Sequence, residues 1–195
     1  MSTPKHICVY CSASRDLAPV YHEAAAVLGR LMAERGDTLV YGGGSYGLMG
    51  EVARATHAGG GRVIGIMPTF LKSQEFVFHD ADEMIITTDM RERKAGMYQR
   101  ADAFIALPGG IGTLEEVFEI MTLRSLNIAK HPLVLINTCG FYDPLQALLD
   151  KMNEERFLRR PVSEIFYLAA DAFDALSYID AHVELPSERA SQSGA

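Results

Sequence analysis

Short apolar runs alternate with longer amphipathic segments along almost the whole of this chain, and this alternation constrains the fold more than any other feature. Each apolar run predicts a strand, because it is short and is bounded by polar or turn-forming residues. The expected strands are Ile7–Cys11, Thr38–Tyr41, Arg62–Met67, Met84–Thr87, Ala103–Leu107, Leu133–Asn137 and Phe166–Ala169. The expected helices are Pro19–Arg35, Gly47–Ala58, Asp89–Arg100, Gly112–Leu126, Pro144–Asn153 and Asp171–His182.

Strands that are separated by helices are joined by right-handed crossovers, which give a parallel sheet. The strands are almost continuously apolar, as expected where helices cover both faces of the sheet. We therefore predict an α/β fold, a Rossmann-like doubly wound parallel sheet in a single domain. The length of 195 residues favours one domain. We assign residues 1–185 to it and expect the small, polar tail at 186–195 to be disordered.

Composition and charge limit the partners that this chain is expected to bind and the cellular compartment in which it is expected. The formal net charge of −7 gives the chain no general attraction to nucleic acid. Its start lacks the basic and apolar regions of a signal peptide, and no run approaches the ~18 apolar residues that would span a membrane. Three cysteines without a signal peptide predict a cytoplasmic protein with no disulfide framework. The histidines show no metal-binding spacing, so no metal is expected.

Cys8 and Cys11 match the C-x-x-C redox motif, but Cys8 lies inside an expected strand. Residues three apart on a strand point to opposite faces of the sheet. A redox pair needs both thiols together at a turn that opens a helix, so this function is disfavoured.

Ligands of doubly wound sheets bind beyond the carboxyl ends of the strands. This rule selects the segments Ser12–Arg15, Gly42–Gly47, Pro68–Phe78 and Pro108–Thr113. The second and fourth are glycine loops that lead from a strand into a helix, where backbone N–H groups and the helix dipole favour an anion. We expect both loops to approach phosphate.

The loop at Gly42–Gly47 matches G-x-G-x-x-G, which suggests dinucleotide binding. That motif also requires an acidic residue at the end of the next strand, and this strand ends in Met67 and Pro68 instead. NAD is therefore disfavoured, and neither loop has the Gly-Lys-Ser/Thr ending of a P-loop.

The loop at Pro108–Thr113 has two interpretations. In one, Thr113 caps the following helix and Glu116 completes a capping box, with the glycines merely shaping the turn. In the other, the loop cradles a phosphate. Three glycines within four positions cost more conformational entropy than a simple turn requires, which favours the cradle.

Two basic residues, Arg93 and Lys94, share a helix face with Met90 and Met97. A solvated charged face is the ordinary explanation for such a run. Since two anion-binding loops are expected at the same edge of the sheet, phosphate recognition is the alternative, with a bidentate fork from Arg93 and a point charge from Lys94.

Four motifs occur here in a characteristic order. They are Val40-Tyr41-Gly42-Gly43-Gly44, Gly47-Leu48-Met49-Gly50, Met90-x-x-Arg93-Lys94 and Pro108-Gly109-Gly110-x-Gly112-Thr113-x-x-Glu116. Together they closely resemble the Lonely Guy family of cytokinin-activating phosphoribohydrolases, once labelled "possible lysine decarboxylase". The resemblance covers about residues 5–181. Family members commonly read Cys-Gly-Ser-Ser where this chain has Cys11-Ser12-Ala13-Ser14, so the chain departs from the family pattern in this first loop.

The resemblance implies hydrolysis of the N-glycosidic bond of N6-modified adenosine 5′-monophosphates, and in bacterial members often of AMP, to a free base and ribose 5-phosphate. It implies Arg93 and Glu116 as the catalytic pair, a homodimer and no cofactor. Glu116 would stabilise the oxocarbenium-like transition state or activate water. The residues expected to contact substrate are Ser12, Gly43, Gly44, Glu75, Arg93, Lys94, Gly109, Gly110, Ile111, Gly112, Thr113, Leu114, Glu115, Glu116 and Thr122.

Two other functions compete with this one. Lysine decarboxylation needs a lysine Schiff base with pyridoxal phosphate, and none of the lysines has a suitable sequence context. A non-catalytic nucleotide or cofactor carrier on the same fold is the second alternative, since related folds host many functions. A carrier would have no need of Arg93 together with Glu116.

Overall fold

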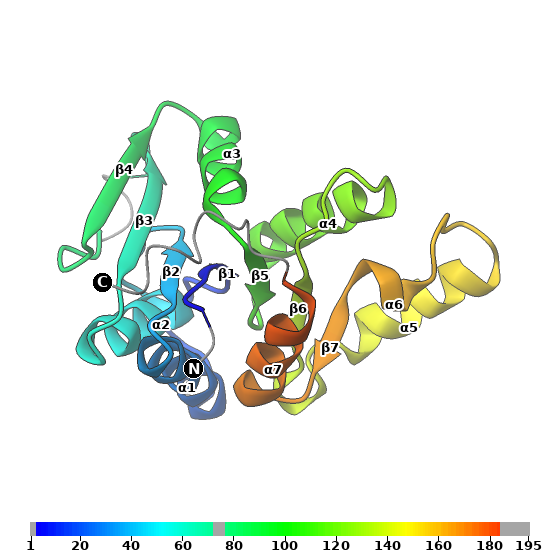
Figure 1. The fold of residues 1–195 in the computed structure, drawn as a ribbon, viewed down its shortest axis with the longest axis horizontal. Coiled ribbons are helices and arrows are strands. Elements are labelled where there is room, and N and C mark those ends of the chain that lie inside the picture. The colour runs from blue at the N-terminus through cyan, green and yellow to red at the C-terminus, as the bar shows by residue number, and fades with distance from the viewer. Residues whose placement is uncertain (1–2, 72–76, 184–195) are drawn as a thin grey trace.

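The computed structural model describes residues 3–71 and 77–183. Within them the chain forms one parallel sheet of seven strands in the order β4-β3-β2-β1-β5-β6-β7 (Figure 1). The strands are β1 (His6–Tyr10), β2 (Thr38–Tyr41), β3 (Val63–Pro68), β4 (Glu83–Thr87), β5 (Ala103–Ala106), β6 (Leu133–Ile136) and β7 (Tyr167–Ala169). The α/β class and the doubly wound parallel sheet are confirmed. The expected tail at 186–195 lies outside the described residues.

Helices connect the strands. They are α1 (Pro19–Glu34), α2 (Gly47–Ala58), α3 (Met90–Arg100), α4 (Ile111–Ser125), α5 (Asp143–Glu154), α6 (Val162–Ile165) and α7 (Ala172–His182), with a 3-10 turn, η1 (Thr138–Gly140), before α5. The six longer helices match the predicted ones to within a few residues. The sequence interpretation missed the short helix α6 and the turn η1.

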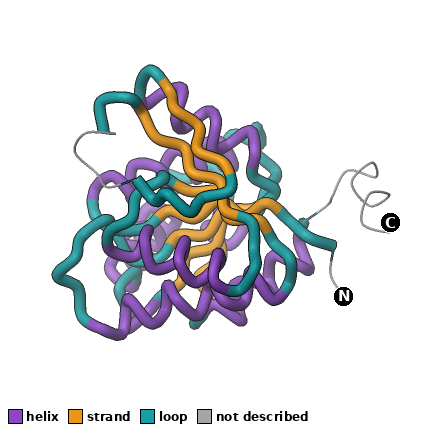
Figure 2. The backbone as a smooth tube through the Cα atoms, turned by 90° about the vertical axis from the view of Figure 1, so that its left-hand side faces the viewer, coloured by secondary structure: helices purple, strands orange, loops and turns teal. Residues whose placement is uncertain are grey.

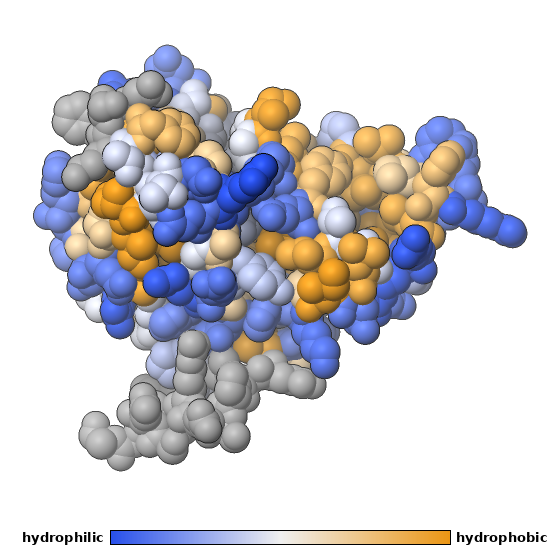
Figure 3. All heavy atoms as spheres, turned by 90° about the horizontal axis from the view of Figure 1, so that it is seen from above, coloured by the Kyte–Doolittle hydropathy of each residue, from blue (hydrophilic) through white to orange (hydrophobic). Residues whose placement is uncertain are grey.

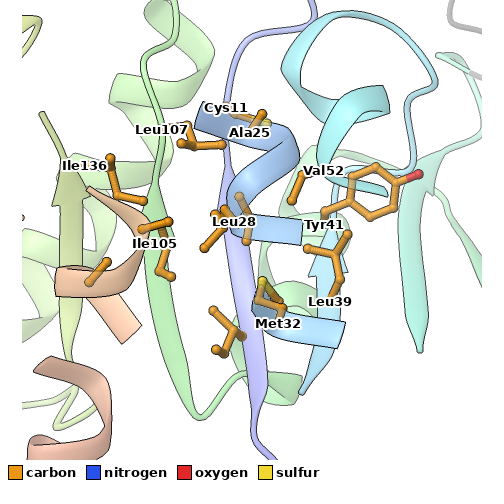
Figure 4. Close-up of a cluster of buried hydrophobic side chains, with 14 of the residues drawn as sticks. Cys11, Ala25, Leu28, Met32, Leu39, Tyr41, Val52, Ile105, Leu107 and Ile136 are labelled. Carbon is orange, nitrogen blue, oxygen red and sulfur yellow. The ribbon is translucent and has the colours of Figure 1, made fainter. Parts of the chain in front are cut away.

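The helices form two layers, one on each face of the sheet (Figures 1 and 2). Alternate residues of β1 belong to different cores: Ile7 and Val9 pack with α1, α2 and α7, whereas Cys8 and Tyr10 pack with α3, α4, α5 and α6. Figure 4 shows the first core, in which Leu28 and Met32 of α1 lie against the central strands. Burial on both faces explains why the strands are apolar throughout.

The two neighbouring cysteines follow the same alternation. Cys8 is buried in the second core and Cys11 in the first, and both are free thiols. The prediction that they point to opposite faces is confirmed, and with it the argument against a redox pair.

The order of the strands reverses between β1 and β5, because the chain runs outward from β1 through β2, β3 and β4 before it returns to β5. The loops that follow β1 and β5 therefore lie side by side, and the Ser12 amide donates to the Pro108 carbonyl at 3.3 Å. A crevice at such a switch point is where this class of sheet binds ligands. No helix of the described residues is long and apolar enough to cross a membrane.

Candidate active site

Helix α4 begins in the glycine loop itself. Its first residue is Ile111, and its N-cap is Gly110, with no side-chain cap. The capping-box interpretation of Thr113 and Glu116, one of the two considered above, is therefore wrong: Thr113 is already inside the helix, and the Glu116 carboxylate accepts from Arg93. The first amides of α4 have no acceptor within the helix, so this end of α4 can bind an anion.

The glycines of this loop serve different purposes. A Cβ at Gly109 would lie 2.2 Å from Thr113 Oγ1, so glycine is sterically required there. A Cβ at Gly110 or Gly112 would meet no atom within 4 Å. The fold does not demand glycine at these two positions, and their absent side chains leave the backbone of the helix end accessible.

Arg93 and Glu116 form a buried ion pair between α3 and α4. Arg93 Nη1 donates to Glu116 Oε1 at 2.6 Å, and the two side chains are 6% and 7% exposed. Arg93 Nε also donates to the Ile66 carbonyl within β3, at 3.2 Å. A Cβ at Gly42 would lie 2.2 Å from Arg93 Nη2, so Gly42 gives the guanidinium the room that it occupies.

The environment of Glu116 sets its protonation. Burial raises the pKa of the Glu116 carboxyl above its ordinary value, and the Arg93 cation opposes this rise through its charge and its hydrogen bond. An arginine is always protonated, so it orients the carboxylate without competing for its proton. Perturbed carboxyls in a cleft are typical of catalytic sites.

The ion pair lines a cavity of about 290 Å³ at the carboxyl edge of the sheet. The lining residues are Cys11, Ser12, Ala13, Met49, Leu71, Met90, Arg93, Gly110, Gly112, Thr113, Glu115 and Glu116. Polar groups from the start of α4 and apolar side chains from other elements thus line the same cavity. A mixed lining of this kind suits a ligand that has both a polar and an apolar part.

The sequence analysis did not expect Met49, Leu71 and Met90 in the cavity lining. Met49 and Met90 stand in two of the family motifs, but an apolar side chain by itself does not indicate a ligand contact. The positions of the three residues gave a signal, since each lies close after a strand end in one of the expected ligand-binding loops or at the start of the helix that follows. Cys11 and Ala13 flank Ser12, which the sequence did single out.

Lys94 lies outside the described cavity lining. Its ammonium contacts the Glu115 carboxylate and lies 3.1 Å from that of Glu119. These bonds raise the pKa of Lys94, the one from Glu115 most strongly. In this arrangement Lys94 links α3 to α4 beside the buried pair.

The first glycine loop has its own structural use. The amides of Leu48 and Met49, at the start of α2, both donate to the Ser12 carbonyl. Gly47 has φ +54°, and a Cβ there would lie 2.4 Å from the Ser14 carbonyl oxygen. The chain itself thus occupies the end of α2, where an anion was expected.

Gly43 and Gly44 also contact protein. The Gly43 carbonyl accepts from the Phe78 amide at 3.1 Å, and Gly44 forms an isolated bridge with Val77. Neither residue is part of the described cavity lining. The first loop instead makes room for Arg93 at Gly42 and binds the segment at Val77 and Phe78.

The remaining expected contacts are spread out. Ile111 is 83% exposed at the start of α4, and Leu114 packs partly against the core. Gly109 lines a smaller, adjoining hollow with Tyr21 and Phe141, and this hollow shares Ser12 and Gly110 with the main cavity. Thr122 is exposed further along α4, where its hydroxyl donates to the Phe118 carbonyl at 2.7 Å. Glu75 lies outside the described residues.

Comparison with known proteins identifies the family. A family model described as "Possible lysine decarboxylase" matches residues 49–179. The cytokinin riboside 5′-monophosphate phosphoribohydrolase LOG of Oryza sativa subsp. japonica is 43% identical over 92% of this chain and 74% of its own. The chain belongs to the Lonely Guy (LOG) family. A second LOG-family relative, the cytokinin riboside 5′-monophosphate phosphoribohydrolase LOG2 of Arabidopsis thaliana, is 42% identical over 92% of this chain and 84% of its own.

Solved structures share the fold of this LOG-family chain at lower identity. The Moco carrier protein of Chlamydomonas reinhardtii has a TM-score of 0.70 at 23% identity, over 91% of this chain and 96% of that one. The molybdenum cofactor binding protein of Rippkaea orientalis has a TM-score of 0.69 at 24% identity, over the same shares. These likenesses concern the fold alone.

Proposed function

We propose that this LOG-family chain hydrolyses the N-glycosidic bond of N6-modified adenosine 5′-monophosphates and releases the free base and ribose 5-phosphate. One observation carries the proposal: the buried Arg93–Glu116 pair lies in the wall of a cavity that also contains the uncapped start of α4. Family membership supports the same activity, because the two relatives named above carry it in their names.

The geometry suggests how the reaction would proceed. The amides at Gly110–Thr113 would hold the 5′-phosphate and thereby fix the ribose against Glu116. The ionised Glu116 would stabilise positive charge on the ribose as the glycosidic bond breaks, or would take a proton from the attacking water. Arg93 would hold the carboxylate in place. Lys94 would reach a phosphate only by leaving Glu115 or Glu119, to which it is bonded here.

The older family description, lysine decarboxylase, does not suit this cavity. Pyridoxal phosphate requires a lysine that can form a Schiff base with it. No lysine is among the described residues that line the cavity. Lys94 is ion-paired with Glu115 and Glu119, and Lys5 with Asp180.

A homodimer is the second part of the proposal. The outer face of α4 exposes Ile111 and Phe118, and Thr122 lies on the same face; Leu126, which directly follows the helix, is also exposed. Figure 3 shows apolar side chains gathered on the half of the molecule that carries α4, α5 and α6 in Figure 1. Thr113 and Thr122 are about 14 Å apart along the helix axis, so Thr122 would contact a nucleotide most readily in the site of a second copy.

The dimer can be tested by light scattering on the purified protein, with Phe118→Glu as the variant. We expect a dimer for the wild type and a monomer for the variant. A wild-type monomer would refute this part of the proposal.

The cytoplasmic location predicted from the cysteine usage stays a prediction.

Incubation with AMP and with isopentenyladenosine 5′-monophosphate, followed by an assay for ribose 5-phosphate, tests the activity directly. We expect release from the isopentenyl nucleotide at least. Tight binding of both nucleotides without any release would favour the carrier, for which the present support is fold likeness alone.

A further inference from the structure

We infer that Tyr142 is a positioning residue for the phosphate-binding loop: its buried phenol holds the strand end from which Pro108–Thr113 departs. The inference rests on the proposed role of that loop in binding the 5′-phosphate. Tyr142 directly precedes α5 and is distant in sequence from every motif considered above.

The key contact is a single hydrogen bond. Tyr142 Oη donates to the Leu107 carbonyl at 2.8 Å, and the residue is 1% exposed. Burial raises the pKa of the phenol, so Tyr142 remains a donor throughout the physiological range. Leu107 follows the last residue of β5 and immediately precedes Pro108.

This bond lies just beyond the last residue of β5 that pairs with β6. The described ladder between β5 and β6 ends with Ala106 opposite Leu135. On the β1 side, the Leu107 amide donates to the Tyr10 carbonyl, and the Pro108 carbonyl accepts from the Ser12 amide. Tyr142 supplies the corresponding attachment on the β6 side.

Tyr142 is itself fixed by a tight turn. Its amide donates to Asn137 Oδ1 at 2.8 Å, and Asn137 Nδ2 donates to Asp143 Oδ1 at 2.6 Å. Gly140 has φ +70°, and a Cβ there would lie 2.6 Å from Asp143 Oδ2. The turn from β6 into α5 therefore delivers the phenol to one defined position.

The attachments at the base of the loop matter because side chains give little support around Gly110 and Gly112. Helix α4 has no side-chain cap, and the positions of Gly110 and Gly112 face open space. A change in direction at Leu107 would be carried into the amides that receive the phosphate. Loss of the phenol also leaves a buried carbonyl without its donor, which favours such a shift.

The test is Tyr142→Phe, which removes one oxygen atom, compared with Tyr167→Phe, which removes the hydroxyl that donates to Asp174 from the edge strand β7. Titration calorimetry with ribose 5-phosphate needs no turnover. We expect the Kd of Tyr142→Phe to rise about threefold to tenfold, with a matching rise in KM and a smaller change in kcat. Tyr167→Phe should bind as the wild type does.

An unchanged Kd for a folded Tyr142→Phe protein would overturn the inference, and so would a wild type that binds no ribose 5-phosphate. If Tyr142→Phe does not fold, Asn137→Ser frees the Tyr142 amide and should weaken binding in the same direction; unchanged binding would again overturn it. Ribose 5-phosphate that binds without any nucleotide cleavage would refute the proposed function and leave the role of Tyr142 intact.

Discussion

At Glu116, the local spacing and the family resemblance give different interpretations, and the structure contradicts only the one drawn from spacing. The spacing from Thr113 to Glu116 predicts a capping box, but α4 begins at Ile111, so the spacing no longer fits a cap. The prediction that Arg93 and Glu116 act together was based on the family resemblance. The room that Gly42 provides for Arg93 depends on β2 and α3 meeting in space, which no local pattern encodes.

The open space at Gly112 gives a prediction about one residue. Gly112→Ala should stabilise the protein by about 0.5–1 kcal/mol, because alanine is the better helix former and its Cβ meets no neighbour. The same methyl group would project toward the cavity that Gly112 lines, so nucleotide binding should weaken. Urea unfolding and calorimetry measure the two effects.

Gly96 in α3 provides the control, since a Cβ there would make only ordinary contacts, at 3.6 Å or more. Gly96→Ala should gain similar stability without a change in binding. Unaltered nucleotide affinity in Gly112→Ala would show that Gly112 is a turn residue and no part of a phosphate cradle.

At the scale of elements, the long helices and the strands could be predicted because each carries its own apolar period and its own stop residues. The short helix α6 could not, since four residues after Pro161 give no period. A tertiary contact holds it: Arg124, in the last turn of α4, donates to the carbonyls of Glu164 and Ile165 and to that of His131.

Arg124→Met should therefore destabilise the fold by about 2–4 kcal/mol, because it removes the donor of these three carbonyls at once, and two of these bonds are partly buried. Arg160→Met is the matched control. Its main partner is the exposed Glu164 on the same segment, and a loss below about 1 kcal/mol is expected. Equal losses in urea unfolding for the two variants would contradict this view of Arg124.

For the molecule as a whole, the order of the strands determines where the site lies. The sequence predicted a doubly wound parallel sheet, but it did not give the order of the strands. The switch between β1 and β5 places the site at one edge of the sheet. Near the start of β1, Asp180 of α7 accepts from Lys5 at 2.7 Å and from Arg35 Nη2 at 2.6 Å. These bonds join the two ends of the described fold.

Asp180 links stability to pH. Burial raises the pKa of its carboxyl, but hydrogen bonds from Arg35 and Lys5 outweigh this and leave the pKa below the ordinary value. Such a group stabilises the fold above the unfolded-state pKa of about 3.9, and the contribution disappears as pH falls further. Asp180→Asn should lower Tm by about 2–4 °C near pH 7.

The difference in Tm between the wild type and Asp180→Asn should shrink as pH falls below about 4. A difference that stays constant down to pH 2 would show that the carboxylate charge is unimportant. Thermal unfolding at a series of pH values provides the measurement.

The most direct test of the account is the rate of ribose 5-phosphate release from isopentenyladenosine 5′-monophosphate by Glu116→Gln. Glutamine keeps an oxygen that can accept from Arg93, so the fold should be retained. Removal of the charge should lower kcat at least about a hundredfold. Glu119→Gln, one turn away and exposed, should turn over at nearly the wild-type rate. Wild-type turnover by a folded Glu116→Gln protein would remove Glu116 from the chemistry and contradict the account.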